Sequence, residues 1–405
     1  MSKFDLREIL LLVYIFFASM SFHSPYLVIG KLTLFDILLI CYLLFTLTFN
    51  GQKLLKQFLI YKPIFQLTLI FTLILFISMV VNSLRGISNP ARAISIVRYP
   101  LFVTLMIVIV DYVGYSTKKL ILASFAYIAG LCLVYYHEWI SALYITKDFF
   151  DAAIPIVGKS SMINKNNIAA IGGLSLPVFL SLFYVLKEKA HYKKIYFLII
   201  PIFIYISITI LFTHSKTGWI PLFLVLSVLF FISSLKNKMV MAGIFLLGYW
   251  LIEKDKIFLW IDVILGKIKS ESSWESRIFL KQQALDAFTA HPILGIGWGS
   301  FDEFLNVADN PHDINMQILA EGGILAFVAY FSVLFIIWHY MFRKIHIFSK
   351  EAIVPMLFIA IYMIISTASG IPFTFHSSWV VFGLILSYCN IIRKKKEYVE
   401  VQISG

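Results

Sequence analysis

The chain has 405 residues, of which 60% are hydrophobic, 17% are aromatic and only 14% are charged. Soluble domains carry about 25% charged residues and about 45–50% apolar ones, so this composition excludes an ordinary soluble protein and predicts an integral membrane protein. The net charge is +12. In a soluble protein it would suggest a nucleic-acid partner, but in a membrane protein lysine and arginine mark cytoplasmic loops, and no nucleic acid is expected.

Twelve apolar segments are predicted to cross a bilayer, for which a helix needs roughly 17–25 residues. They lie near residues 8–23, 32–49, 64–82, 99–115, 120–138, 167–186, 195–213, 217–234, 239–252, 323–341, 353–370 and 376–392. The first lacks the cleavage site of a signal peptide and is interpreted as a membrane helix. The predicted fold is therefore an all-α polytopic membrane protein with about 12 transmembrane helices.

Lysine and arginine gather in alternate gaps between these segments, as expected for cytoplasmic loops. The gaps hold Lys53, Lys56, Lys62, Lys118, Lys119, Lys187, Lys189, Lys193, Lys194, Lys236, Lys238, Arg343, Lys344 and Lys350. A basic run, RKKK, follows the last segment. Both chain ends are therefore predicted to be cytoplasmic. Residues 1–252 would form nine membrane helices, 253–322 one large periplasmic loop containing short helices, and 323–405 three more helices with a basic cytoplasmic tail.

Three arginines lie on the predicted outer side, against the orientation rule, in the segment NSLRGISNPARAISIVR. Arg85, Arg92 and Arg98 are candidates for binding diphosphate or anionic sugars. His376, at the outer end of the last segment, is a weaker candidate. Asp36 is expected to cap or hydrate a membrane end, although charges within membrane segments are functional candidates by default.

A tight outer turn, THSKTGW, joins two of the predicted membrane helices. It holds Lys216 and His214 beside two hydroxyl residues. Lys216 is interpreted either as a lysine that extends to the membrane surface or as a fixed cation at a phosphate site.

The large loop contains SSWESRIFLKQQALDAFTAHP, which predicts a helix that ends at His291 before a proline. Ser272 and Glu275 have the spacing of a capping box, and the sequence places Ile278, Leu285 and Phe288 on one apolar stripe.

Arg277 and Lys281 are four residues apart in this predicted helix and so share a face. Two cations on one face suit an anionic ligand. The alternative is a solvated amphipathic helix at the membrane interface.

The run GIGWGSF follows, and its alternate glycines allow a tight turn or a close approach of the backbone. No strand–turn–helix unit surrounds it, so a dinucleotide site is not predicted. Trp298 and Phe301 are expected to be anchors at the membrane interface.

The stretch NPHDINMQILAEGG precedes the tenth apolar segment. Asn310 and Pro311 predict the start of a helix that runs to Glu321 and stops at the glycine pair. His312 would then lie in the first helical turn, where the helix dipole favours a neutral imidazole that can act as a general base. A structural or solvated histidine is the alternative.

Together, HSKTG, ESRIFLKQQALDAF, HPILGIGWGSF and NPHDINMQILAEGGI resemble the bacterial O-antigen ligase and polymerase superfamily in order and spacing, from about residue 160 to 345. The lead-in KSSMINKNNIAA also resembles the family. These enzymes are similar to the GT-C class of membrane glycosyltransferases. They take a glycan from undecaprenyl diphosphate at the periplasmic face of the inner membrane and pass it to a growing glycan (polymerase) or to the lipid A core (ligase).

The resemblance implies that His312 is the catalytic histidine and that Arg277 meets the diphosphate. Lys281, Asn315, His214, Arg92 and Arg98 are expected at the substrate site. Two residues depart from the family: Lys216 stands where arginine is common and lacks its bidentate fork, and Asp313 stands where asparagine usually follows the histidine.

We expect no cofactor and, because the sequence contains no metal-ligand motif, no bound metal. The expected partners are the lipid-linked donor, a glycan or lipid A-core acceptor, membrane lipids and O-antigen assembly proteins. Polymerase is slightly favoured over ligase. A polysaccharide transporter or flippase predicts charges inside the spans and short outer loops, unlike this chain. A structural envelope protein would not need His312 and Arg277 to lie together.

Overall fold

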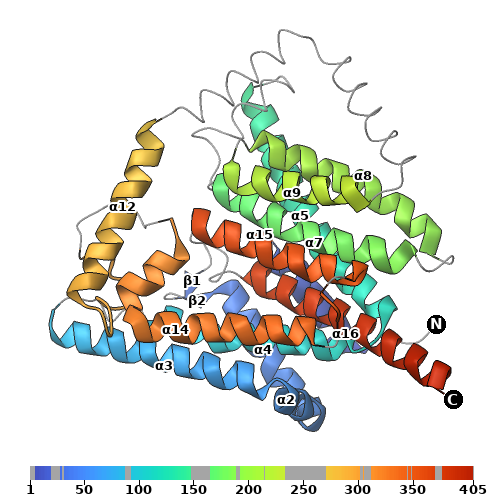
Figure 1. Cartoon of the computed structure of the whole chain (residues 1–405), viewed down its shortest axis with the longest axis horizontal. Helices are drawn as coiled ribbons and strands as arrows, with labels where there is room; N and C mark the ends of the chain where they lie inside the picture. Colours follow the sequence, from blue (N-terminus) through green and yellow to red (C-terminus); the bar gives the residue numbers. More distant parts are fainter. Residues whose placement is uncertain are drawn as a thin grey trace.

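Long helices, most of them apolar, form almost all of the described part of the protein in this computed structural model (Figure 1). The structure describes residues 5–19, 28–29, 32–86, 93–146, 165–187, 192–213, 215–232, 271–301, 304, 312–343, 345–347, 349–369 and 376–404. The helices are α1 (Leu6–Ala18), α2 (Leu34–Ile60), α3 (Lys62–Leu84), α4 (Ala93–Val113), α5 (Thr117–Thr146), α7 (Lys165–Lys187), α8 (Lys193–Phe212), α9 (Lys216–Ile232), α12 (Glu271–Ala290), α14 (Ile314–Phe342), the 3₁₀ helix η4 (Lys350–Ala352), α15 (Ile353–Ser369) and α16 (His376–Ser404). A short antiparallel ribbon pairs β1 (Val28–Ile29) with β2 (Leu32–Thr33).

Six helices in the described part of the chain are long and apolar enough to cross a membrane. They span Lys62–Leu84, Ile96–Val113, Thr117–Ile140, Asn166–Lys187, Ile314–Phe342 and Lys350–Ala368, and three shorter apolar helices span Asp36–Thr48, Phe197–Phe212 and Lys216–Ile232. The all-α polytopic prediction is confirmed. Each predicted segment overlaps a helix except 239–252, which lies outside the described residues, as does most of the predicted loop before α12. The total of twelve spans stays a prediction.

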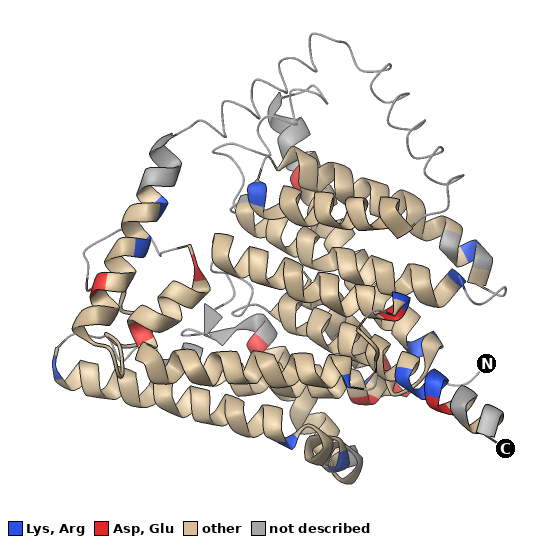
Figure 2. Cartoon of the chain, in the orientation of Figure 1, with Lys and Arg blue, Asp and Glu red and all other residues tan. Residues whose placement is uncertain are grey.

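Charged residues gather mainly at the two ends of the helices, and the middle parts of the helices are mostly uncharged (Figure 2). This is the pattern that a bilayer imposes, because a charge in the hydrocarbon layer is costly. We call the end of the bundle that carries α12 the outer end and the opposite end the inner end.

The basic segments that the sequence predicts on one side of the membrane lie together at the inner end. Lys119 at the start of α5 forms an ion pair with Glu8 of α1. The Tyr340 hydroxyl near the end of α14 donates to the carbonyl of Ile60, which ends α2. Arg393 of α16 donates to the Tyr340 carbonyl at 2.8 Å. The alternation of basic gaps therefore agrees with the packing.

Helix α7 lies at the centre of the bundle, and 89% of its most apolar stretch is buried. Small residues let its neighbours approach closely, as is usual between membrane helices. A Cβ on Gly172 would lie 2.1 Å from the Tyr135 hydroxyl oxygen of α5 and 2.7 Å from Ile210 of α8. The helices α5, α7 and α8 are therefore closely packed against one another.

Helix α12 runs across the outer ends of α3, α14 and α15, steeply inclined to them (Figure 1). It ends at Ala290, directly before His291, as the His–Pro pair predicted. It begins at Glu271, one residue before the expected capping box. The helix therefore brings its side chains over the ends of membrane helices that are distant in sequence.

Candidate functional site

Helix α14 is broken near its outer end by Gly323, whose backbone is non-helical with φ 67° and ψ −171°. The break separates a short segment from Ile314 to Gly322 from the membrane-crossing part of the helix. A Cβ at Gly323 would lie 2.3 Å from the carbonyl oxygen of Ile293, so only glycine fits here. The predicted stop at the glycine pair is confirmed.

The loop from Pro292 to Phe301 folds back onto this break. The amide of Ile296 donates to the Ala320 carbonyl and that of Gly297 to the Glu321 carbonyl, each at 2.9 Å. The amide of Ile324 donates to the Pro292 carbonyl at 2.9 Å. These bonds satisfy backbone groups that the broken helix leaves unpaired. The close backbone approach predicted for the glycine run is confirmed.

Trp298 and Phe301 are buried, with 5% and 0% of their surface exposed. The prediction that they are anchors at the membrane interface is therefore wrong. Because the loop packs against the bundle, the Trp298 ring meets Tyr99 of α4 edge-on, with centroids 5.8 Å apart. The amide of Phe301 donates to a carboxylate oxygen of Glu321 at 3.1 Å. Both residues hold the loop against the bundle and do not anchor the protein at the membrane surface.

The packed face of α12 differs from the expected stripe. Leu280, Ala284 and Ala287 are buried in a small core with Ile296, Phe301 and Ala320. Ile278 and Leu285 are 51% and 39% exposed. The small alanines allow α12 to approach the broken end of α14, which a stripe of large side chains does not permit.

Asp313, and not Asn310, caps α14. Its side chain accepts from the amides of Asn315 at 3.0 Å and Met316 at 3.3 Å, and the helix begins at Ile314. The prediction that His312 lies in the first turn is therefore wrong, since His312 precedes the cap. Asn310 and Pro311 lie outside the described residues.

His312 has φ 51°, and it is the one non-glycine residue in the described chain with positive φ. This left-handed conformation costs a residue with a side chain roughly 1–2 kcal/mol. The backbone turns sharply here and delivers a half-buried imidazole directly beside the cap of α14. Backbone strain of this kind clusters at active sites and ligand-binding sites.

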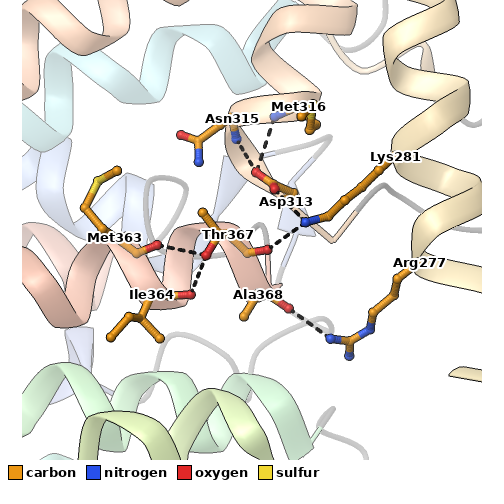
Figure 3. Close-up of polar contacts among 9 residues, drawn as sticks. All are labelled: Arg277, Lys281, Asp313, Asn315, Met316, Met363, Ile364, Thr367 and Ala368. Carbon is orange, nitrogen blue, oxygen red and sulfur yellow. Dashed lines mark hydrogen bonds and ion pairs between the residues drawn. The ribbon is translucent and has the colours of Figure 1, made fainter. Parts of the chain in front are cut away.

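Two cations of α12 reach the ends of α14 and α15 (Figure 3). The Lys281 Nζ lies 2.9 Å from the Asp313 Oδ2 and 3.4 Å from the Thr367 carbonyl. The Arg277 Nη1 makes a long contact of 3.5 Å with the Ala368 carbonyl. Both carbonyls belong to the last turn of α15, where the helix dipole attracts positive charge. The structure thus brings together Arg277, Lys281 and the His312–Asp313 segment.

The two cations differ in their partners. Lys281 is neutralised by Asp313. Arg277 has no carboxylate partner among the described residues, and its contact is with a neutral carbonyl. The site therefore carries a net positive charge at Arg277, on a guanidinium whose planar fork matches phosphate oxygens.

Asn315 follows in the first turn of α14. Its Oδ1 is buried and accepts no hydrogen bond from the described residues. Buried polar atoms without a partner are rare in proteins and call for an explanation. Its side chain is directed away from Lys281 and Arg277 (Figure 3), and a buried acceptor atom of this kind is suited to a hydroxyl donor.

The other predicted site residues have no described contact with Arg277, Lys281 or the His312–Asp313 segment. Lys216 begins α9 and is exposed. The turn before it is fixed by Ser215, whose hydroxyl donates to Asn166 Oδ1 at 2.7 Å. His214 and Arg92 lie outside the described residues. No described contact joins Lys216 to Lys281 or Arg277.

Arg98 forms an ion pair with Asp36, with Nε 3.0 Å from Oδ2. Asp36 lies in the first turn of α2 and is fully buried, so the expectation that it is hydrated at a membrane end is wrong. Sequence reasoning missed this pair because the two residues are separated by 62 positions. The signal available was an aspartate within an apolar segment.

The cap leads to a prediction about stability. Replacing Asp313 with alanine is expected to lower the free energy of unfolding by about 0.5–2 kcal/mol, because two amides lose their acceptor. Asparagine keeps an acceptor and loses only the ion pair with Lys281, whose ammonium is partly exposed, worth about 0.2–1 kcal/mol. Thermal unfolding of the purified variants measures this. Equal losses for both variants would show that the ion pair, and not the cap, holds this helix end.

Residues 201–331 match the model of a protein family described as O-antigen ligase. The matched range covers about a third of the chain and includes α9, α12, the glycine loop and the His312 segment. The resemblance to the O-antigen ligase and polymerase superfamily is confirmed over this range. It supports a multi-pass membrane enzyme of the glycosyltransferase type. A search of curated proteins finds no match to the chain.

Proposed function

We infer that this chain, which matches the O-antigen ligase family over residues 201–331, is an inner-membrane glycosyltransferase. It transfers a glycan from undecaprenyl diphosphate to an acceptor sugar hydroxyl at the periplasmic face. The observation that carries this proposal is the meeting of Arg277, Lys281 and the His312–Asp313 segment at the outer end of the bundle. Cations beside a histidine, above apolar helices, suit a lipid-linked diphosphate.

The chemistry needs a stabilised leaving group and an activated hydroxyl. The acceptor oxygen forms a bond to the anomeric carbon while the bond from that carbon to the diphosphate oxygen breaks. Arg277 stabilises the charge that develops on the diphosphate. The imidazole of His312 accepts the proton of the acceptor hydroxyl. Direct displacement inverts the configuration at the anomeric carbon, whereas a retaining enzyme of the common kind needs a carboxylate as nucleophile.

Asp313 and Asn315 have separate roles in this mechanism. Asp313 holds the helix end and Lys281, so it fixes the backbone that carries His312. The buried Oδ1 of Asn315 is an acceptor for a second hydroxyl of the incoming sugar. Lys216 remains a candidate for a second phosphate contact, since it lies at the N-terminus of α9.

We predict that transfer does not require a metal ion, because guanidinium and ammonium groups supply the positive charge. A chelator such as EDTA is then expected to leave the initial rate of the purified enzyme unchanged within about twofold. Loss of activity with EDTA, followed by recovery on adding magnesium or manganese, would contradict this mechanism.

Within this class we propose a polymerase, which passes the growing glycan to the next repeat unit. The alternative is a ligase, which joins the glycan to the lipid A core. The matched family is described as O-antigen ligase, and the match does not separate the two reactions. The residues named above serve both reactions, because the donor and the nucleophile are chemically the same. The acceptor alone separates them.

A lipopolysaccharide gel from a strain that lacks this chain distinguishes the two. Loss of a polymerase leaves the core bearing a single repeat unit. Loss of a ligase leaves a bare core while long glycan accumulates on the lipid carrier. Either pattern must revert when the wild-type chain is restored. Accumulation of single lipid-linked units on the cytoplasmic side would instead contradict the proposal and support a transporter.

A further inference from the structure

Four side chains at the outer end form a connected cluster of polar contacts that the mechanism above does not use. Arg98 of α4 donates through Nε to Asp36 Oδ2 of α2 at 3.0 Å. The Nε2 of His376, the first residue of α16, lies 3.1 Å from Asp36 Oδ1. The Tyr14 hydroxyl of α1 lies 2.5 Å from the Nδ1 of His376. Helices from the beginning and the end of the chain thus meet at one carboxylate.

The contacts fit a neutral His376 whose Nδ1 accepts the Tyr14 hydroxyl proton and whose Nε2 carries a hydrogen. Both oxygens of Asp36 then have a polar neighbour: Arg98 donates a hydrogen bond to Oδ2, and the His376 Nε2 lies 3.1 Å from Oδ1. The net charge of the cluster is zero, with one carboxylate and one guanidinium. A buried carboxylate requires a compensating cation, and Arg98 supplies it.

The position of Arg98 indicates a role in addition to holding the helices together. Buried ion pairs contribute little stability compared with apolar side chains of similar volume. Asp36 is 0% and His376 6% exposed, whereas the Arg98 side chain is 23% exposed. Arginine has five N–H donors, only one of which is on Nε. Anchoring through Nε therefore fixes the plane of the guanidinium while part of the side chain remains accessible.

Arg98 also lies next to the structures that support the proposed site. Its neighbour Tyr99 packs edge-on against Trp298, with centroids 5.8 Å apart. Trp298 belongs to the loop that is hydrogen-bonded to the outer segment of α14, whose cap is Asp313. His376 is in turn held by Phe102, at a centroid distance of 4.8 Å. Packed side chains thus connect this cluster with the loop that is hydrogen-bonded to the outer segment of α14.

We propose that Asp36 and His376 are positioning residues, which hold Arg98 ready to bind the diphosphate of the lipid-linked donor. This inference rests on the proposed glycosyltransferase function and adds to it a cation from the first part of the chain. A guanidinium that is already oriented loses less side-chain entropy when the ligand binds. Asp36 and His376 act only through Arg98, so their effects must vanish when Arg98 is changed.

A double-mutant cycle tests this with the full chain in nanodiscs and farnesyl diphosphate as the probe. Arg98→Gln keeps a donor for Asp36 and removes the charge, and it is expected to weaken binding about tenfold, as the loss of a charge-assisted hydrogen bond does. Asp36→Asn is expected to weaken binding about fivefold and His376→Ala about threefold. In the Arg98→Gln background, neither substitution is expected to weaken binding further.

A matched control separates positioning from a loss of helix packing. Asn390→Leu removes another buried hydrogen bond of α16, from Asn390 Nδ2 to the Tyr61 hydroxyl at 3.0 Å, at the inner end. It is expected to lower the melting temperature without changing the affinity for farnesyl diphosphate. If Asp36→Asn lowers the melting temperature alone, or weakens binding equally in both backgrounds, the positioning role is wrong.

Two further outcomes distinguish this inference from the function on which it rests. If Arg277→Ala weakens binding of the probe and Arg98→Gln does not, the role of Arg98 is wrong and the diphosphate site remains. If the wild-type chain does not bind farnesyl diphosphate, both the role of Arg98 and the proposed donor site are wrong.

Discussion

Replacing His312 with glycine is expected to lower the rate constant of glycan transfer by about 10²–10⁴-fold, the usual contribution of a general base. The acceptor hydroxyl loses its proton acceptor, while Arg277 still binds the diphosphate. The affinity for the donor should therefore change little. Initial rates of transfer by the purified protein, measured at several donor concentrations, separate these two quantities.

Glycine is the informative substitution because of the backbone at this position. His312 has φ 51°, a conformation that glycine adopts without cost and that alanine adopts at roughly 1–2 kcal/mol. His312→Gly is thus expected to be at least as stable as the wild-type protein. His291→Ala, which changes a half-buried histidine packed edge-on against Phe304, provides the control and should retain activity. Full activity of His312→Gly would remove His312 from the mechanism.

Replacing Gly323 with alanine is expected to lower the free energy of unfolding by about 2–5 kcal/mol. Two costs combine at this position. The positive φ of 67° strains any residue with a side chain by roughly 1–2 kcal/mol. The new methyl group would lie 2.3 Å from the Ile293 carbonyl oxygen and 2.7 Å from the Gly295 nitrogen, and overpacking of this kind costs typically about 1–3 kcal/mol.

Two other glycines separate these costs. Gly86 has φ 72° and no atom within 4 Å of an added Cβ, so Gly86→Ala is expected to show the backbone strain alone. Gly51 has open space around it and no positive φ, so its substitution should be neutral or slightly stabilising. Unfolding of the three variants in the same detergent gives the order directly. A Gly323→Ala variant as stable as Gly86→Ala would mean that the loop does not pack against the break in α14.

Local features of the sequence predicted much of the fold. Hydropathy located the membrane helices, because a bilayer requires long apolar segments wherever they occur. The glycine pair before the tenth segment predicted the break in α14, and His291–Pro292 predicted the end of α12. Each of these signals depends on residues that are neighbours in the chain, so no knowledge of the tertiary structure was needed.

Features that depend on tertiary contacts were predicted poorly. Two caps compete in NPHDIN, and Asp313 prevails over Asn310 in the structure, where it also meets Lys281 of another helix. The exposed Ile278 and the buried Trp298 reverse the expected pattern, because the loop and α12 pack on each other with small residues between them. No local rule joins Asp36 to His376, which is 340 positions away along the chain.

The central claim is that this chain transfers a glycan from a lipid-linked diphosphate to a sugar hydroxyl. The most direct measurement supplies the purified wild-type chain with the undecaprenyl-diphosphate-linked repeat unit as the only donor. Mass spectrometry then quantifies the free undecaprenyl diphosphate and the glycan that has gained a unit. We predict equal amounts of both products. A donor that stays intact in the presence of either acceptor, a second repeat unit or lipid A core, would contradict the account.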